Sequence, residues 1–247
     1  MSHTMISRAP RRIGLIGHGQ IGRAVADAVC AGRAGAWELA AILTRNGAAA
    51  ALHHGTPESF FEVPVDLYLE CAGPQALAQL GEGALQRADV WSVSGVALAD
   101  AAVRARLEAA GTRYGHRLRL VAGAVGGLDA VQALAVDPAA CVDITVVAPG
   151  AGDSFAASAR DAAALRPHGV NVAVAVAFAG AGLDRTLVHF NNDPDLSCHA
   201  ISVHARSAYG SFESRLLPAT DAQRGLHVVA ASLLAALRQA EHVIWSG

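Results

Sequence analysis

Short apolar runs alternate with helical patterns along the first half of the chain. The runs predict strands at residues 13–16, 38–43, 65–70, 90–93 and 117–121. Helical patterns lie between them at 21–30, 75–87 and 99–110, the last ending at Gly111 as a C-cap. Repeated strand, helix, strand order predicts an α/β fold of the Rossmann type, a doubly wound parallel sheet that binds ligands at the carboxyl ends of its strands.

The second half has a different pattern. A helical stretch ends at Leu134, and strands are predicted at 141–148, 186–191, 198–205 and 212–217. Residues 170–178 alternate Val with Ala, a pattern that leaves strand and buried helix both open. A last apolar helix, 225–243, could return to cover the first domain. We therefore expect residues 1–122 plus 222–247 to form a dinucleotide-binding domain and 123–221 an α/β (α+β) domain for substrate binding and dimerisation.

Composition narrows the class of protein. With 247 residues and 53% hydrophobic content, the chain can bury one large core or two modest ones. A formal charge of −2 and few aromatic residues argue against nucleic acid as a partner. The longest apolar stretch, 170–183, is shorter than the ~20 residues that cross a bilayer, so no membrane span is expected. The basic amino terminus leads into only a short apolar run, which is not the pattern of a signal peptide.

The cysteines bear on location and on metal binding. All are widely spaced, with no C-x-x-C pair: Cys30, Cys71, Cys141 and Cys198. This spacing is typical of reduced thiols in the cytoplasm, and it implies neither a disulfide framework nor a metal site.

A glycine triplet follows the first predicted strand and opens the first predicted helix. Gly17 permits a tight turn, Gly19 lets backbone amides approach a pyrophosphate, and Gly22 lets the helix pack against the strand. Gln20 and Ile21 lie between them, at the helix terminus whose free N–H groups attract phosphate. We therefore expect a nicotinamide dinucleotide on this turn.

The residues after the second strand bear on which nicotinamide cofactor is used. An acidic side chain at this place would bind the ribose 2′-hydroxyl of NAD, but the chain has Thr44 and Arg45. A guanidinium with a neighbouring hydroxyl suits a 2′-phosphate, which favours NADP over NAD. The alternative is a solvated arginine in an enzyme that accepts either cofactor.

Several segments together resemble one family, the L-aspartate dehydrogenases. They occur in the family's order over nearly the whole chain: residues 17–22 (GHGQIG), 70–76 (ECAGPQA), 92–98 (SVSGVAL), 122–129 (AGAVGGLD), 170–173 (VNVA), 182–186 (GLDRT), and Asp193 with Pro194 before His199. The resemblance implies reversible oxidation of L-aspartate to iminoaspartate, which water converts to oxaloacetate and ammonia. It also implies a homodimer and a link to pyridine nucleotide biosynthesis.

The resemblance also assigns residues. Ala124 and Asn171 match positions at the nicotinamide end of the cofactor, and Ala72 lies in a loop expected to face the cofactor. His199 matches the catalytic histidine and is also expected to contact substrate; a side chain with a pKa of about 6.5 suits imine hydration and loss of ammonia. The alternative for His199 is a strand histidine bonded to a backbone carbonyl.

The chain departs from the family pattern at the substrate pocket. The family has an Asn-Pro-Lys-Thr-Ser motif where this chain has residues 222–226 (AQRGL), so Arg224 could replace the carboxylate-binding lysine. The alternative for Arg224 is an exposed arginine before the last helix. Ser197 stands where the family has asparagine, and Gly169 replaces another asparagine. Two other functions therefore stay open: a related amino-acid dehydrogenase or imine reductase with a different substrate, and a catalytically decayed NADP-binding sensor.

Overall fold

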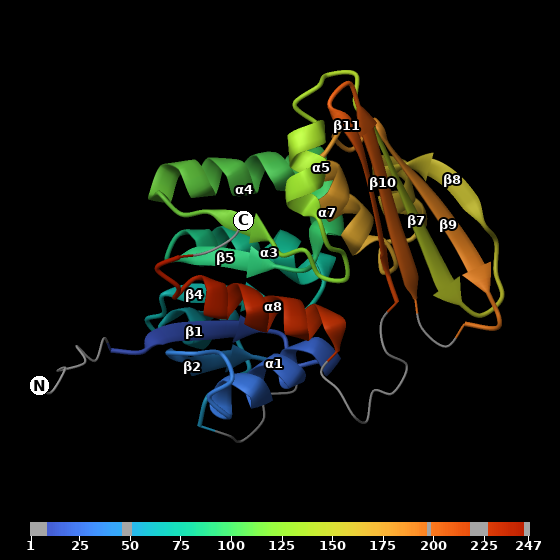
Figure 1. Cartoon of the computed structure of the whole chain (residues 1–247). Helices are drawn as coiled ribbons and strands as arrows, with labels where there is room; N and C mark the ends of the chain where they lie inside the picture. Colours follow the sequence, from blue (N-terminus) through green and yellow to red (C-terminus); the bar gives the residue numbers. More distant parts are fainter. Residues whose placement is uncertain (1–8, 46–50, 197–198, 218–226, 245–247) are drawn as a thin grey trace, which may run out of the picture.

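The computed structural model describes residues 9–45, 51–196, 199–217 and 227–244. The chain forms two units, each built on one sheet (Figure 1). The first unit is a parallel sheet with helices around it, and the second is a mixed sheet whose helices lie between the two sheets.

The first sheet has six strands in the order β3-β2-β1-β4-β5-β6. Every neighbouring pair is parallel. The chain builds outward from β1 in one direction and then from β4 in the other, so the sheet is doubly wound and the predicted fold class is confirmed. The strands are β1 (Arg11–Ile16), β2 (Trp37–Leu43), β3 (His53–His54), β4 (Leu67–Glu70), β5 (Asp89–Ser92) and β6 (Leu118–Leu120).

The helices of the first unit follow the predicted order, except that one predicted end is wrong and two short helical elements, at residues 57–61 and 95–99, were not predicted. They are α1 (Gln20–Cys30), α2 (Pro57–Phe61), α3 (Pro74–Leu85), the 3₁₀ turn η1 (Gly95–Ala99), α4 (Ala101–Tyr114) and α8 (Val228–Gln239). The prediction that Gly111 ends α4 is wrong. The helix runs on to Tyr114 and ends at Gly115, which has a φ of 75°. Gly111 instead makes room for the returning chain, because a Cβ there would lie 2.8 Å from the carbonyl oxygen of His116.

The second sheet has five strands in the order β11-β10-β7-β9-β8, with only β7 and β9 parallel. The strands are β7 (Cys141–Pro149), β8 (Phe155–Ser158), β9 (Thr186–Asp193), β10 (Ala200–Ser207) and β11 (Gly210–Leu216). The helices α5 (Leu128–Leu134), α6 (Ala159–Leu165) and α7 (Asn171–Ala179) belong to this unit. The Val/Ala stretch is therefore a helix. Its consecutive residues 173–177 are all buried, and all of them except Ala175 lie in one core with the β7 side chains Val142 and Ile144, so period alone could not identify it.

The carboxyl-terminal helix α8 returns to the first unit, where it lies beside α1 (Figure 1). Leu233 and Leu237 are buried in one cluster with Val25 and Val29 of α1. The indole Nε1 of Trp37 donates to the carbonyl oxygen of Leu237 at 3.0 Å. Among the residues described, no helix is long and apolar enough to span a membrane.

Candidate active site

The glycine turn between β1 and α1 has the shape that a dinucleotide requires. Gly17 has a φ of 98°, which other residues rarely adopt. A Cβ at Gly22 would overlap the carbonyl oxygen of Gly17, whereas a Cβ at Gly19 would have no neighbour within 4 Å. The turn is therefore packed tightly on its inner side and open at Gly19. With Gln20 and Ile21 in the first turn of the 11-residue helix α1, it fits a bound diphosphate.

The loops after β2 and β4 lie against this turn. The amide of Gly17 donates to the carbonyl oxygen of Leu43 at 2.9 Å, directly before Thr44. A Cβ at Gly17 would lie 2.7 Å from the Cβ of Ala72, so only glycine allows this approach. The structure thus brings Gly17, Thr44 and Ala72 together at the carboxyl edge of the sheet, where the ligand of a doubly wound fold binds.

The β2 end of this edge carries basic side chains. Arg45 is exposed after Thr44, whose amide donates to the carbonyl oxygen of His54 at 3.0 Å. The rings of His18 and His53 meet edge to face, 4.9 Å between centroids. Burial and the nearby His53 lower the pKa of His18. A negatively charged group beside His18 would oppose this lowering, because it stabilises the protonated ring.

Glu70 lies at the carboxyl end of β4 and is completely buried. Its oxygens accept hydrogen bonds from the amides of Ala72 and Gly73 and from the hydroxyl of Ser92. Burial raises the pKa of the Glu70 carboxyl, and these donors, together with Ser94, oppose the shift.

Asn171 joins the two units. It opens α7 in the second unit, and its Oδ1 accepts a hydrogen bond from the amide of Val96 at 3.0 Å. Val96 belongs to η1, which follows the loop after β5. Asn171, the predicted nicotinamide contact, therefore lies beside the carboxyl edge of the first sheet. Its Oδ1 is already engaged in a hydrogen bond between the two units.

His199 has a second histidine as its neighbour. It is exposed just before β10, and it is close enough to His227 for its charge to lower the pKa of His227, after the larger effect of burial. His227 caps α8, its Nδ1 accepting from the amide of Val229 at 3.2 Å. Val229 reaches back to the loop that carries Ala124, with a methyl group 3.9 Å from a Cβ placed on Gly123. Three segments distant in sequence thus meet where the two units face each other.

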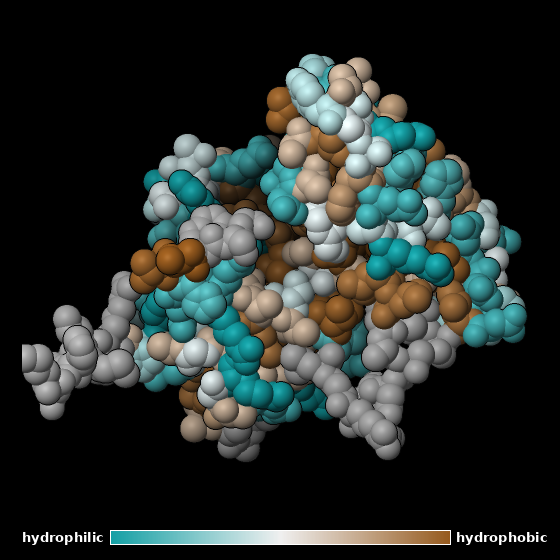
Figure 2. Space-filling view, viewed as in Figure 1, coloured by the Kyte–Doolittle hydropathy of each residue, from teal (hydrophilic) through white to brown (hydrophobic). Residues whose placement is uncertain are grey.

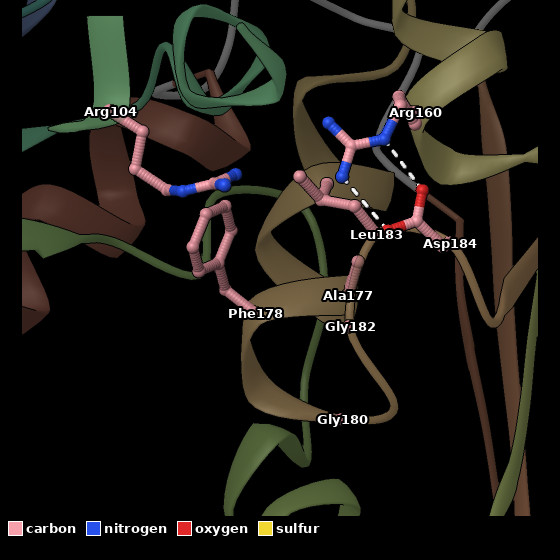
Figure 3. A pocket seen from close by; sticks show the side chains of 8 residues that line it. All are labelled: Arg104, Arg160, Ala177, Phe178, Gly180, Gly182, Leu183 and Asp184. Carbon is pink, nitrogen blue, oxygen red and sulfur yellow. Dashed lines mark hydrogen bonds and ion pairs between the residues drawn. The ribbon is translucent and has the colours of Figure 1, made fainter. Parts of the chain in front are cut away.

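Figure 2 shows apolar surface in the recess between the two units. A cavity of 270 Å³ also lies between the units, lined by residues of α4, α6 and α7 (Figure 3). It contains none of the predicted site residues, and ligand pockets are usually larger, about 300–1,000 Å³. Its charged side chains already have partners in the protein: Arg104 lies 3.9 Å from Glu108 and donates to the carbonyl oxygen of Leu98. Arg160 binds both carboxylate oxygens of Asp184, at 2.6 and 2.9 Å, and donates to the carbonyl oxygen of Ala99 at 2.9 Å. We interpret this cavity as a packing gap between the two units and not as a ligand site.

Comparison with known proteins identifies the family. The family profile described as the C-terminal domain of aspartate dehydrogenase matches residues 149–240, and that of the homoserine dehydrogenase NAD binding domain matches 17–121. An L-aspartate dehydrogenase of Ruegeria pomeroyi is 37% identical, the match covering 92% of each chain. L-aspartate dehydrogenase 2 of Bordetella bronchiseptica is 38% identical, covering 92% of this chain and 96% of that protein.

This chain belongs to the L-aspartate dehydrogenase family. The crystal structure of aspartate dehydrogenase from Thermotoga maritima has the same fold, with a TM-score of 0.79 at 23% identity, covering 96% of this chain and 99% of that one. The first unit is thus the pyridine-nucleotide-binding part of an oxidoreductase, and the family resemblance seen in the sequence is confirmed.

Two of the predicted positions where this chain departs from the family, Arg224 and Ser197, lie outside the described residues. Two residues of the site escaped the sequence analysis. Glu70 was visible as an acid ending an apolar strand, and His227 as a polar residue opening an apolar helix. Neither signal identifies a partner, because the partners of both residues come from other segments of the chain.

Proposed function

We propose that this protein is an NAD(P)-dependent L-aspartate dehydrogenase that converts L-aspartate reversibly to oxaloacetate and ammonia through iminoaspartate. The proposal depends most on one observation: the relatives of that name match both units of the chain at 37–38% identity. The glycine turn and the predicted catalytic histidine come from different units, and a reaction between a cofactor and a substrate would bring the two units together around both.

The residues of the chain divide the work between them. A bound pyridine nucleotide supplies the acceptor for the hydride that leaves the α-carbon of the substrate. Gly17, Gly19 and Gly22, with the first turn of α1, would hold its diphosphate, and Ala72, Ala124 and Asn171 would lie toward its nicotinamide end. His199 would accept and return protons as water adds to the imine and ammonia leaves, since an imidazole exchanges protons near neutral pH.

We further propose that NADP is the preferred cofactor. The support is that neither residue after β2, Thr44 or Arg45, is acidic, and that the histidine pair His18 and His53 lies at the same end of the sheet's carboxyl edge. A 2′-phosphate adds negative charge where these groups supply hydrogen-bond donors. NAD would lack that interaction while keeping the remaining contacts.

The remaining predictions complete the proposal. Residues 1–122 with 222–247 would form the dinucleotide domain and 123–221 the substrate domain, with Arg224 holding a carboxylate of the substrate.

The helices α5, α6 and α7 cover one face of the second sheet, and the other face carries Val147 and the exposed Leu187 on neighbouring strands. A homodimer would cover this face. We expect the protein in the cytoplasm.

A substrate panel tests the function. The purified protein is incubated with L-aspartate, D-aspartate, L-glutamate and L-alanine, each with NAD or NADP, and reduction of the cofactor is followed by absorbance. The reverse reaction uses oxaloacetate and ammonia. Turnover selective for L-aspartate supports the proposal. Faster turnover of another amino acid would show a related dehydrogenase, and saturable cofactor binding without any turnover would show a sensor.

A further inference from the structure

Glu70 is a carboxylate with no exposed surface at the cofactor-binding edge, and the proposed reaction does not yet account for it. Its neighbours in β4, Tyr68 and Leu69, are buried too. Removing a carboxylate from water costs several kcal/mol unless hydrogen bonds compensate. An apolar residue would end the strand without that cost, so the acid indicates a task that an apolar side chain cannot perform.

The first carboxylate oxygen of Glu70 organises the loop after β4. Its Oε1 accepts from the amide of Ala72 at 2.7 Å and from the amide of Gly73 at 2.8 Å. Two consecutive amides held by one charged acceptor fix the path of the loop, since hydrogen bonds to ionised groups are about twice as strong as neutral ones. The amide of Ala72 is thereby occupied, and the exposed Ala72 is held beside Gly17 of the glycine turn.

The second oxygen organises the loop after β5. Its Oε2 accepts from the hydroxyl of Ser92 at 2.5 Å, and the same hydroxyl oxygen accepts from the amide of Ser94 at 2.9 Å. Ser92 and Ser94 are buried as well. One carboxylate therefore joins two neighbouring loops through a relay of hydrogen bonds. All the donors that reach Glu70 fit an ionised carboxylate, which only accepts.

The order of the strands places these loops relative to a cofactor. Successive strands are added on one side of β1 up to β3 and on the other side from β4 onward, and a dinucleotide lies across the point between β1 and β4 where this order reverses. The residue after β2 contacts the ribose of the adenosine half. The nicotinamide half therefore lies over β4 and β5. Building on the proposed function, we propose that Glu70 is a positioning residue that holds the loops after β4 and β5 as the seat of the nicotinamide half.

Amide hydrogen exchange in the cofactor-free protein tests the clamp itself. Glu70→Ala should speed exchange of the Ala72, Gly73 and Ser94 amides about tenfold, as expected for loss of charge-assisted hydrogen bonds. Ser92→Ala is the matched variant, which should speed exchange at Ser94 and leave Ala72 and Gly73 slow. The amide of Arg23 in α1 should be unaffected in both. Unchanged exchange in Glu70→Ala would overturn the inference. If Glu70→Ala does not fold, Glu70→Gln replaces it: loss of the negative charge should speed exchange of the Ala72 and Gly73 amides, and unchanged exchange at both would overturn the inference.

Ligand binding tests the assignment to the nicotinamide half. The probes are NADPH and 2′-phospho-ADP, which lacks both the nicotinamide ring and its ribose. Glu70→Ala should weaken binding of NADPH about tenfold or more and change binding of the fragment less than about twofold. Equal changes for both probes, or none for either, would overturn the assignment. A wild-type protein that binds neither probe would overturn the proposed function and this assignment with it, while the exchange experiment would still decide the clamp.

Discussion

The carbonyl oxygen of Gly17 occupies the space in which a Cβ on Gly22 would lie. The oxygen belongs to the backbone of a tight turn, so it cannot move aside as the end of a flexible side chain would. Gly22→Ala should therefore push α1 away from the turn, lower the free energy of unfolding by about 1–3 kcal/mol and weaken cofactor binding. Denaturant unfolding and a fluorescence titration with NADPH measure the two effects.

Gly19→Ala is the matched control for that experiment. A Cβ at Gly19 has no protein neighbour within 4 Å, and its φ of −78° suits any residue. We expect nearly unchanged stability in the cofactor-free protein and weaker binding of NADPH, because the methyl group lies where the backbone should approach the diphosphate. Full cofactor affinity in Gly19→Ala would contradict the placement of the diphosphate.

Arg45 should determine the preference between the two cofactors. Arg45→Ala is expected to weaken NADPH binding roughly tenfold, since a hydrogen bond to a charged group contributes about 1.5–3 kcal/mol, and to leave NADH binding nearly unchanged. Arg33, also exposed but at the other end of α1, provides the control variant Arg33→Ala. Equal loss of affinity for both cofactors would show that Arg45 does not recognise the 2′-phosphate.

His199 should be needed for turnover but not for cofactor binding. It lies in the second unit, whereas the diphosphate seat lies in the first, so His199→Ala should lower kcat at least about a hundredfold and leave the Kd for NADPH within twofold. His242, exposed beyond the far end of α8, is the control histidine. Retained turnover in His199→Ala would reject the catalytic assignment.

Arg224 should contribute to binding of the substrate and not to binding of the cofactor. Arg224→Ala is expected to raise the KM for L-aspartate roughly tenfold or more through loss of a bidentate carboxylate contact, with little change in the KM for the cofactor. Arg224→Lys should restore part of the affinity, because lysine keeps the charge but lacks the fork. A similar rise for substrate and cofactor would indicate that residue 224 does not bind the carboxylate.

The sequence predicted those features that depend on neighbours in the chain. The glycine turn follows from a strand, a turn and a helix that are contiguous, and the parallel sheet follows from their repetition. The short elements β3 and β8 carry too few residues to show a period, and the sequence analysis missed both. The helix α7 was ambiguous because five consecutive residues at its centre, 173–177, are all buried and show no helical period.

The polar contacts of the site could not be predicted in the same way. Ser92 follows Glu70 by 22 positions, and Asn171 lies 75 positions beyond Val96. No local pattern links such residues, since the fold alone brings them together. The resemblance to a family supplied His199 by alignment, but it could not supply His227, because the segment before His227 departs from the family pattern.

His227 should make the stability of the protein depend on pH. Its pKa is lowered from 6.5, first by burial and then by the charge of His199. The unfolded chain therefore binds the proton more readily than the folded one, so the free energy of unfolding should fall as the pH drops below about 6.5, level off below the lowered pKa and stay constant above 6.5. Protonation also removes the Nδ1 acceptor that caps α8 at Val229.

His227→Asn separates the cap from the titration. Asparagine caps a helix well but does not titrate, so the variant should retain most of the stability above pH 7. His18, whose pKa is also lowered, titrates in both proteins and cancels in the comparison. Denaturant unfolding at several pH values between 5 and 8 measures the free energy of unfolding of the wild type and of His227→Asn. The stability of the wild type relative to His227→Asn should decline below pH 6.5. A difference that does not vary with pH would show that the pKa of His227 is the same in the folded and the unfolded chain, which would contradict the prediction.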